Sequence, residues 1–167
     1  MLSISLSSYS QQIDTATYAI EEVDSIPEAN EIELFNRAKV FIANVFNDPK
    51  YAVMYEDKAN NKISLQATTF YPKLMAFSPY GSVKFNLDIE FKNGRYKYTF
   101  YHFEHISPVN YARYFSIGYF DHSILPSGRN KKRYVIDFKK KVMNDFRGGY
   151  AQVLKKYMRK QYVTSGW

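Results

Sequence analysis

Residues 83–105 read VKFNLDIEFKNGRYKYTFYHFEH, and the pattern in this stretch determines the expected fold. Apolar and polar side chains alternate over residues 83–92, which is typical of a strand with one face buried and one face open. The dipeptide Asn93-Gly94 follows and favours a type I′ turn, because both positions of that turn need positive φ. A two-residue turn fixes the register of the hairpin: Lys92 faces Arg95, Phe91 faces Tyr96, Ile89 faces Tyr98, Leu87 faces Phe100 and Glu90 faces Lys97.

The segments before this hairpin predict one helix and three shorter strands. Asn30 followed by Glu33 resembles a capping box, which marks the start of a helix. Apolar residues at helical spacing then predict an amphipathic helix over 31–46. Weaker alternation predicts strands over 15–23, 51–56 and 62–70.

The segments after the hairpin predict a long connection and a final helix. Residues 107–128 show no clean period, and we expect one short strand near 114–120. Apolar residues return at helical spacing and predict a helix over about 138–162, kinked at Gly148-Gly149. The elements together predict a single α+β domain over 13–167 in the order β-α-β-β-β-β-α. Its antiparallel sheet of four or five strands has helices packed on one face.

The composition is that of a globular domain rich in aromatic residues. The 167 residues include 16 Tyr and 13 Phe, which favour strands and buried sheet faces. There is no cysteine, so disulfides and thiolate metal sites are excluded. No apolar run approaches the roughly 20 residues needed to span a bilayer. The net charge of +7 is concentrated at one end: from Gly128 onward there are twelve Lys and Arg residues against two acids.

The first twelve residues read MLSISLSSYSQQ and carry no charged side chain. A short apolar stretch precedes Ser8-Tyr9-Ser10-Gln11, which resembles a signal-peptidase site. We therefore expect residues 1–12 to be the remnant of a secretory signal or, alternatively, a disordered polar tail. The first interpretation predicts a periplasmic or secreted protein.

The basic C-terminal helix is the strongest signal outside the core. Its cations would suit an anionic lipid surface or an anionic polymer, whereas a solvated helix face with lysine stems covering the sheet is the plainer interpretation. Nucleic acid is not expected as a partner, because an exported protein rarely meets it. The residues predicted for binding to an anionic surface are Lys131, Lys132, Arg133, Lys155, Lys156, Arg159 and Lys160.

The second candidate surface is the face of the sheet that points away from the helices. Alternation along the hairpin places Tyr101 and Phe103 on this face, with Thr99 and Asn86. If the 107–136 connection leaves it uncovered, the face would suit a peptide, a glycan or a partner protein.

No catalytic, cofactor or metal-binding site is expected from the sequence. His102, Glu104 and His105 lie close together, but a strand places the first two on one face and His105 on the other. They therefore do not supply three convergent ligands. There is also no nucleophile elbow, phosphate-binding loop or dinucleotide fingerprint.

Three segments resemble a known family: LFNRAK at 34–39, VMYEDK at 53–58 and NGRYKYTF at 93–100. The family consists of domains of unknown function with a TBP-like fold, that of the TATA-binding protein, and is typical of secreted or envelope proteins in Bacteroidota. The resemblance spans about 18–105 and implies an antiparallel sheet with helices on one face, export, and no catalytic residues. The expected function is a non-enzymatic binding or structural role in the cell envelope. The alternatives are a peripheral binder of anionic lipid or polymer and an enzyme of unrecognised type.

Overall fold

The computed structural model describes residues 17–46, 48, 52–72, 81–107, 116–123 and 129–160. The predicted signal remnant at 1–12 lies outside the described residues, as does much of the 107–136 connection. The elements along the chain are β1 (Ile20–Ser25), α1 (Glu31–Val45), β2 (Ala52–Asp57), β3 (Lys62–Tyr71), β4 (Gly81–Lys92), β5 (Arg95–Ile106), β6 (Gly118–Tyr119), α2 (Arg129–Asp145), the π-helical turn η1 (Phe146–Tyr150) and α3 (Ala151–Arg159).

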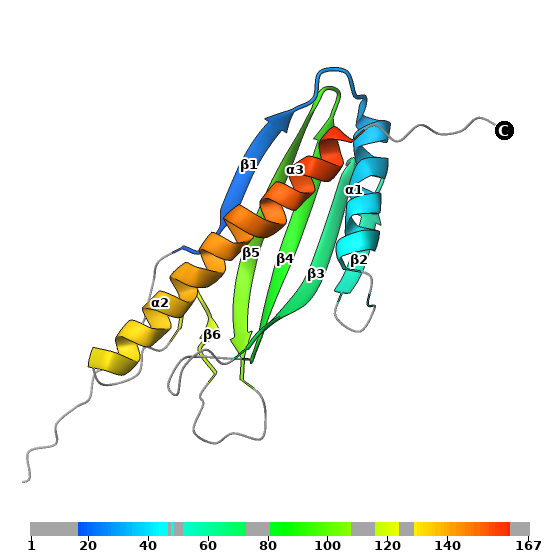
Figure 1. The fold of residues 1–167 in the computed structure, drawn as a ribbon. Helices are drawn as coiled ribbons and strands as arrows, with labels where there is room; N and C mark the ends of the chain where they lie inside the picture. Colours follow the sequence, from blue (N-terminus) through cyan, green and yellow to red (C-terminus); the bar gives the residue numbers. More distant parts are fainter. Residues whose placement is uncertain are drawn as a thin grey trace, which may run out of the picture.

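The strands form one antiparallel sheet in the order β1-β5-β4-β3-β2, and the short β6 pairs with the far end of β5. Figure 1 shows α1 and the continuous α2–η1–α3 rod on one face of this sheet. We call the opposite face, over which no described helix lies, the open face. The predicted α+β architecture with helices on one face is therefore confirmed.

The register predicted for the central hairpin is confirmed for all five pairs, from Lys92–Arg95 to Leu87–Phe100. The predicted type I′ turn is wrong. Gly94 has φ 74°, but Asn93 does not have a positive φ, and a type I′ turn needs both. The turn is instead bonded to the start of α1, where the Asn93 Oδ1 accepts from the Glu31 N–H at 3.2 Å and the Gly94 N–H donates to the Ala29 carbonyl at 2.9 Å.

A β-bulge in β5 reverses the side-chain alternation of its second half. The register with β4 shifts between Lys84 and Asn86, and β5 holds one extra residue there. That residue is His102, whose φ is 54°. The prediction that Phe103 shares a face with Tyr101 is therefore wrong, because Phe103 points into the core and is 1% exposed.

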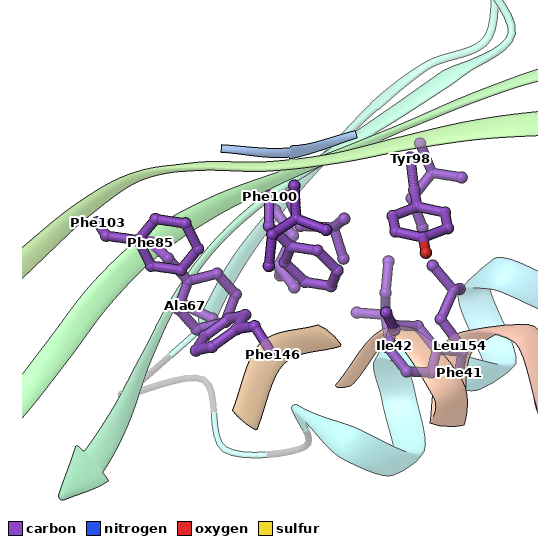
Figure 2. Close-up of a cluster of buried hydrophobic side chains, with 14 of the residues drawn as sticks. Phe41, Ile42, Ala67, Phe85, Tyr98, Phe100, Phe103, Phe146 and Leu154 are labelled. Carbon is purple, nitrogen blue, oxygen red and sulfur yellow. The ribbon is translucent and has the colours of Figure 1, made fainter. Parts of the chain in front are cut away.

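The core lies between the sheet and the helices and is largely aromatic. Phe146 of η1 sits at its centre, with ring centroids 4.6 Å from Phe85, 4.9 Å from Phe103 and 5.3 Å from Phe100, all in edge-to-face contact. Figure 2 shows Phe41 of α1 and Leu154 of α3 facing the same layer from the helices. One core thus joins both helices to the long strands.

The first helix matches its prediction closely. The side chain of Asn30 accepts from the Glu33 N–H at 2.9 Å, which satisfies one of the free donors at the helix start. The last helix begins earlier than predicted, at Arg129 rather than near 138. The reason is that the buried stripe starts at Val135, one turn before Phe138, and the preceding Lys and Arg residues are good helix formers. Within the described residues, no helix combines the length and the apolar character needed to cross a membrane.

Candidate functional site

The seven cations predicted for surface binding do not share one environment. Lys131, Lys132 and Arg133 lie in the first turns of α2, and Lys156 and Lys160 lie at the other end of the rod. Lys155 and Arg159 instead turn toward the sheet edge and pair with acids of β1. The sequence pattern could not separate these two groups, because the acids that select between them lie more than 130 residues away.

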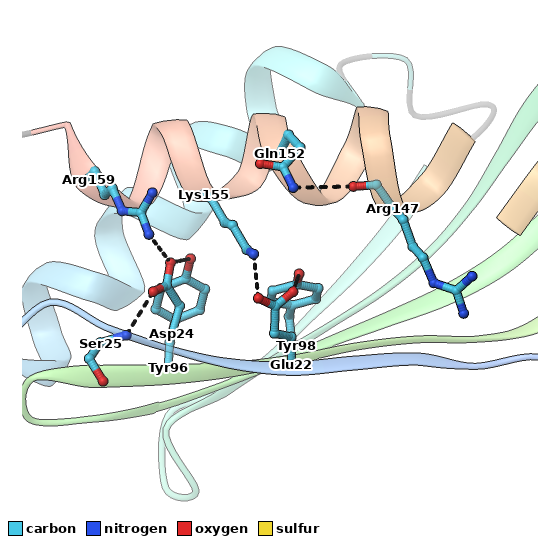
Figure 3. Close-up of polar contacts among 9 residues, drawn as sticks. All are labelled: Glu22, Asp24, Ser25, Tyr96, Tyr98, Arg147, Gln152, Lys155 and Arg159. Atoms are coloured by element: carbon cyan, nitrogen blue, oxygen red, sulfur yellow. Dashed lines mark hydrogen bonds and ion pairs between the residues drawn. The ribbon is translucent and has the colours of Figure 1, made fainter. Parts of the chain in front are cut away.

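Lys155 and Arg159 form two ion-pair clusters that fasten α3 to β1, and Figure 3 shows both. In the first, Lys155 pairs with Glu22, which also accepts from the Tyr98 hydroxyl at 2.5 Å. In the second, Arg159 pairs with Asp24 at 2.8 Å, and Asp24 accepts from the Tyr96 hydroxyl at 3.2 Å. Each carboxylate is thus held between a helix cation and a strand tyrosine.

The pKa shifts in these clusters have clear causes. The hydrogen bonds from Lys155 and then Tyr98 lower the pKa of Glu22 below its ordinary value. Burial, followed by the Glu22 carboxylate, raises the pKa of Tyr98. Burial and the charge of Asp24 raise the pKa of Tyr96 in the same way. The raised pKa values keep the two tyrosine hydroxyls protonated, so they donate to the carboxylates of β1. Lys155 and Arg159 pair with the same carboxylates and therefore have a structural role at the sheet edge.

Four other cations lie along one flank of the rod, whereas the predicted Lys131 and Lys132 lie on other sides of α2. Arg129, Arg133, Lys140 and Arg147 follow one another at spacings of four, seven and seven residues, which places them on one side of the helix. They are exposed, and Lys156 on α3 is exposed as well, although its spacing of nine residues from Arg147 turns it to another side of the helix. We call these five residues the basic flank. Arg133 pairs with Asp137 at 3.5 Å, and the other four have no acidic partner in the described part of the chain.

The residues predicted for surface binding did not include Arg129, Lys140 and Arg147, although all three belong to the basic C-terminal part of the sequence. The helix was predicted to begin near 138, so the spacing that joins Arg129 and Arg133 to Lys140 was not recognised. Figure 3 shows Arg147 on the same side of the helix as Lys155 and Arg159.

Lys139, in contrast, is a core residue and is fully buried. Its ammonium donates to the Phe120 carbonyl at 2.8 Å and to the Ser123 hydroxyl at 2.5 Å, and lies 4.7 Å from the centre of the Tyr18 ring. Burying a cation requires such hydrogen bonds and ring contacts. Lys139 therefore anchors α2 to the segment that follows β6.

The open face of the sheet carries as many cations as acids. The strand registers place on it the cations Lys62, Lys84, Lys92, Arg95 and Lys97 and the acids Glu21, Asp57, Asp88, Glu90 and Glu104. Several are paired, such as Lys62 with Asp88 at 2.7 Å and Lys97 with Glu90 at 3.4 Å. This face therefore lacks the excess positive charge that a polyanion would require.

The two histidines of β5 lie on opposite faces of the sheet. His105 is fully buried, where its Nδ1 accepts from the Ile117 N–H at 3.1 Å and its ring packs against Phe138. His102 and Glu104 lie on the open face. Among the described residues, no group of three or more potential metal ligands converges.

A shallow hollow of about 530 Å³ lies where the hairpin turn meets the start of α1. Glu28 is the single ionisable residue in its lining. The Asn30 and Asn93 side chains there already bind N–H groups of the first turn of α1. The hollow thus offers no pair of titratable groups for acid–base chemistry. Its lining residues are Ser25, Pro27, Glu28, Ala29, Asn30, Asn93 and Gly94.

A family model described as a domain of unknown function (DUF4468) with TBP-like fold matches residues 21–105, from β1 to the end of β5. The chain belongs to the DUF4468 family. The resemblance seen in the sequence is thereby confirmed, and the matched segment excludes the α2–η1–α3 rod. No curated protein matches the sequence significantly.

Two solved structures share the fold. A TBP-like protein from Parabacteroides distasonis superposes with a TM-score of 0.62 and 11% identity, covering 87% of this chain and 95% of its own. A DUF4468 family protein from Bacteroides ovatus superposes with a TM-score of 0.61 and 10% sequence identity, covering 88% of this chain and 89% of its own. At these identities the likeness shows the fold alone, and a shared fold does not carry the DNA-binding activity of the TATA-binding protein.

Proposed function

We propose that this DUF4468 domain is a non-enzymatic binding protein of the cell envelope that attaches to an anionic lipid surface through the basic flank. The observation that carries the proposal is the separation of charge between the two faces of the molecule. The open face is balanced, whereas residues 129–160 hold twelve cations and two acids. Nine of these cations are neither buried, as Lys139 is, nor paired with β1, as Lys155 and Arg159 are. A positive field on one face orients a protein toward a negative surface.

The start of α2 argues that this charge has a role beyond solubility. Its first turn contains no acid, and four of its first five residues are Arg or Lys. Cations at a helix N-terminus oppose the helix dipole, at a cost of about 0.3–1 kcal/mol each. The helix dipole therefore does not favour this cluster, whereas an anionic partner would.

The shape of the basic flank favours an extended partner. From Arg129 to Lys156 the rod spans about 40 Å at the helical rise of about 1.5 Å per residue. No exposed aromatic residue lies among the five cations, so we expect electrostatic and reversible attachment rather than insertion. Each Lys or Arg near an anionic membrane contributes about 1 kcal/mol.

The assignment to the envelope is supported by the signal-like residues 1–12 and by the resemblance to exported Bacteroidota domains. Expression of the gene with its native upstream region, followed by fractionation and N-terminal sequencing, tests it. A mature protein that starts near Gln11 in the periplasmic or secreted fraction is expected. A cytosolic protein that retains Met1 would contradict the assignment.

Cosedimentation with phospholipid vesicles tests the attachment. The wild type is expected to bind vesicles that contain phosphatidylglycerol or cardiolipin and not pure phosphatidylcholine, with affinity falling as salt rises. The variant K140E/R147E/K156E should bind at least about tenfold more weakly.

The matched control is K84E/K92E/R95E on the open face, which changes the net charge by the same amount. This control should lose much less affinity if the flank is the contact surface. Equal loss in both variants, or no binding of the wild type to anionic vesicles, would refute the proposal.

A further inference from the structure

The bulge at His102 places an imidazole where a regular strand would not. His102 is one of two described non-glycine residues with positive φ, and the other, Asn61, lies in the β2–β3 turn where such a conformation is common. His102 lies instead within a twelve-residue strand, between Tyr101 and Glu104, which both pair with β4. Bulges of this kind re-aim side chains and cluster beside binding sites.

The re-aimed ring joins an aromatic group on the open face. Its centroid lies 4.8 Å from that of Tyr101 and 6.5 Å from that of Tyr119, which is 53% exposed. The Tyr101 hydroxyl donates to Asp88 at 3.2 Å, and Asp88 in turn holds Lys62, so the Tyr101 ring is fixed before any ligand arrives. The three rings form a small aromatic platform on this face.

Amide groups border this platform on the side of β4 and β3. The Gln66 amide donates to the Asn86 Oδ1 at 3.2 Å, and the Asn86 amide lies 3.4 Å from the His102 Nδ1. Since Asn86 is the donor in that contact, a neutral His102 carries its proton on Nε2, which has no partner in the described part of the chain. The second N–H of the Gln66 amide has no partner among the described residues either. The amide groups of Gln66 and Asn86 and the imidazole of His102 therefore place hydrogen-bond donors beside the rings.

The chemistry of this arrangement selects a neutral ligand with many hydroxyl groups. Charge balance across the open face disfavours polyanions, and the paired Lys62 and Asp88 are not free to bind a charged group. Aromatic rings supply an apolar surface for the C–H face of a sugar ring, while amide and imidazole N–H groups bind its hydroxyls. A few directed polar groups around aromatic side chains are the usual lining of a small-molecule site.

We propose that Tyr101, His102 and Tyr119, with Asn86 and Gln66, form a binding site for a neutral oligosaccharide. The ligand lies across the bulge, with one sugar ring against the aromatic platform and its hydroxyls directed at the amides. This site is on the face opposite the core and helices, so its occupancy is independent of the basic flank.

The deciding variant is His102→Gly, because glycine adopts φ 54° without strain. It removes the imidazole while preserving the bulge, so the variant should fold at least as well as the wild type and yet lose the ligand. Asn61→Gly is the matched control, since it relieves the same kind of backbone strain in the β2–β3 turn. His102→Asn is the second variant, because asparagine tolerates the left-handed region and keeps a polar side chain there.

The measurement is an NMR titration of His and Tyr ring signals with maltohexaose, cellohexaose, laminarihexaose and chitohexaose at millimolar concentrations. At least one of them should shift the signals of Tyr101, His102 and Tyr119 in the wild type and in Asn61→Gly. His102→Gly and His102→Asn should weaken that binding at least about tenfold. The proposal is overturned if none of the four sugars shifts these signals, or if His102→Gly binds as the wild type does.

Discussion

The guanidinium of Arg37 in α1 donates a 2.5 Å hydrogen bond to the backbone carbonyl of Met158 in the last turn of α3. Its second terminal nitrogen pairs with Glu33 at 2.5 Å, and the side chain is 2% exposed. The carbonyls at a helix end lack partners within the helix, so Arg37 closes the end of α3 from a neighbouring element. The two helices over the sheet are joined through this contact.

Replacing Arg37 should therefore destabilise the domain strongly. Arg37→Ala leaves the Met158 carbonyl unpaired and opens a void, with an expected loss of about 2–4 kcal/mol in the free energy of unfolding. Arg37→Met fills most of the volume without burying a charge, so its loss should be smaller. Urea unfolding of both variants measures the difference. An Arg37→Ala protein as stable as the wild type would show that the contact contributes nothing.

The cluster of Glu22, Tyr98 and Lys155 should make stability fall in acid. The pKa of Glu22 is lowered in the folded protein, so its contribution is complete above the unfolded value of about 4.3 and is lost as pH falls through the folded value. Glu22 is nearly half exposed, so solvent screening limits the contribution to about 1 kcal/mol or less. Glu22→Gln should flatten the acid side of the stability profile measured by thermal unfolding. The difference between Glu22→Gln and wild type should shrink in high salt, and a difference that grows with salt would contradict an ion pair.

The same cluster predicts sensitivity to alkali. The pKa of Tyr98 is raised in the folded state, so above pH of about 10 the unfolded chain loses protons that the folded chain keeps. Stability should therefore fall as pH rises past that point. Tyr98→Phe removes this titration and should give a shallower alkaline slope, at a loss of about 1 kcal/mol near neutral pH for the missing hydrogen bond. An unchanged alkaline slope in Tyr98→Phe would contradict the attribution of this slope to the titration of Tyr98.

Relief of backbone strain should raise stability at two positions. Both His102 and Asn61 have positive φ, and glycine there removes a steric cost of about 1 kcal/mol. We expect His102→Gly and Asn61→Gly each to unfold at a temperature equal to or above that of the wild type. A clear loss of stability in His102→Gly would mean that its ring contributes packing that outweighs the strain.

The glycines of the π-helical turn should tolerate alanine. A Cβ atom added at Gly148 or Gly149 meets nothing within 4 Å, and neither residue has positive φ. Each alanine should therefore stabilise the domain by about 0.5–1 kcal/mol. Gly94 provides the contrast, because its φ is 74° and a Cβ there would lie 3.4 Å from the Pro27 Cα. Gly94→Ala should destabilise, and thermal unfolding of the three variants tests the order.

Much of the fold follows from local patterns. The alternation at residues 83–92 and a two-residue turn were enough to predict the register of β4 with β5, and Asn30 was enough to predict the start of α1. The predicted turn type was wrong because Asn93 is hydrogen-bonded to α1, and such a tertiary contact overrides the intrinsic preference of Asn-Gly. The predicted face of Phe103 was wrong because a β-bulge adds one residue to the strand without leaving a local signature in the sequence.

The candidate surfaces were harder to predict than the fold. In the sequence, Lys155 and Arg159 resemble any other surface cations. Their structural role is apparent only from the ion pairs with the distant acids of β1. Lys139 sits in a run of three lysines, and its burial depends on the ring of Tyr18 and the carbonyl of Phe120. In both cases the deciding partner is far away along the chain, where periodicity and spacing carry no information.

The pairing of Glu22 and Asp24 with Lys155 and Arg159 also sets an order of events during translation. The ribosome makes β1 first, but β1 pairs with β5 and is fastened by α3, which is made last. A growing chain can therefore pair β1 with β5 before α3 is made, but the ion pairs that hold β1 to the helix layer form only after α3. The edge strand therefore depends on contacts with two segments that lie far from it along the chain.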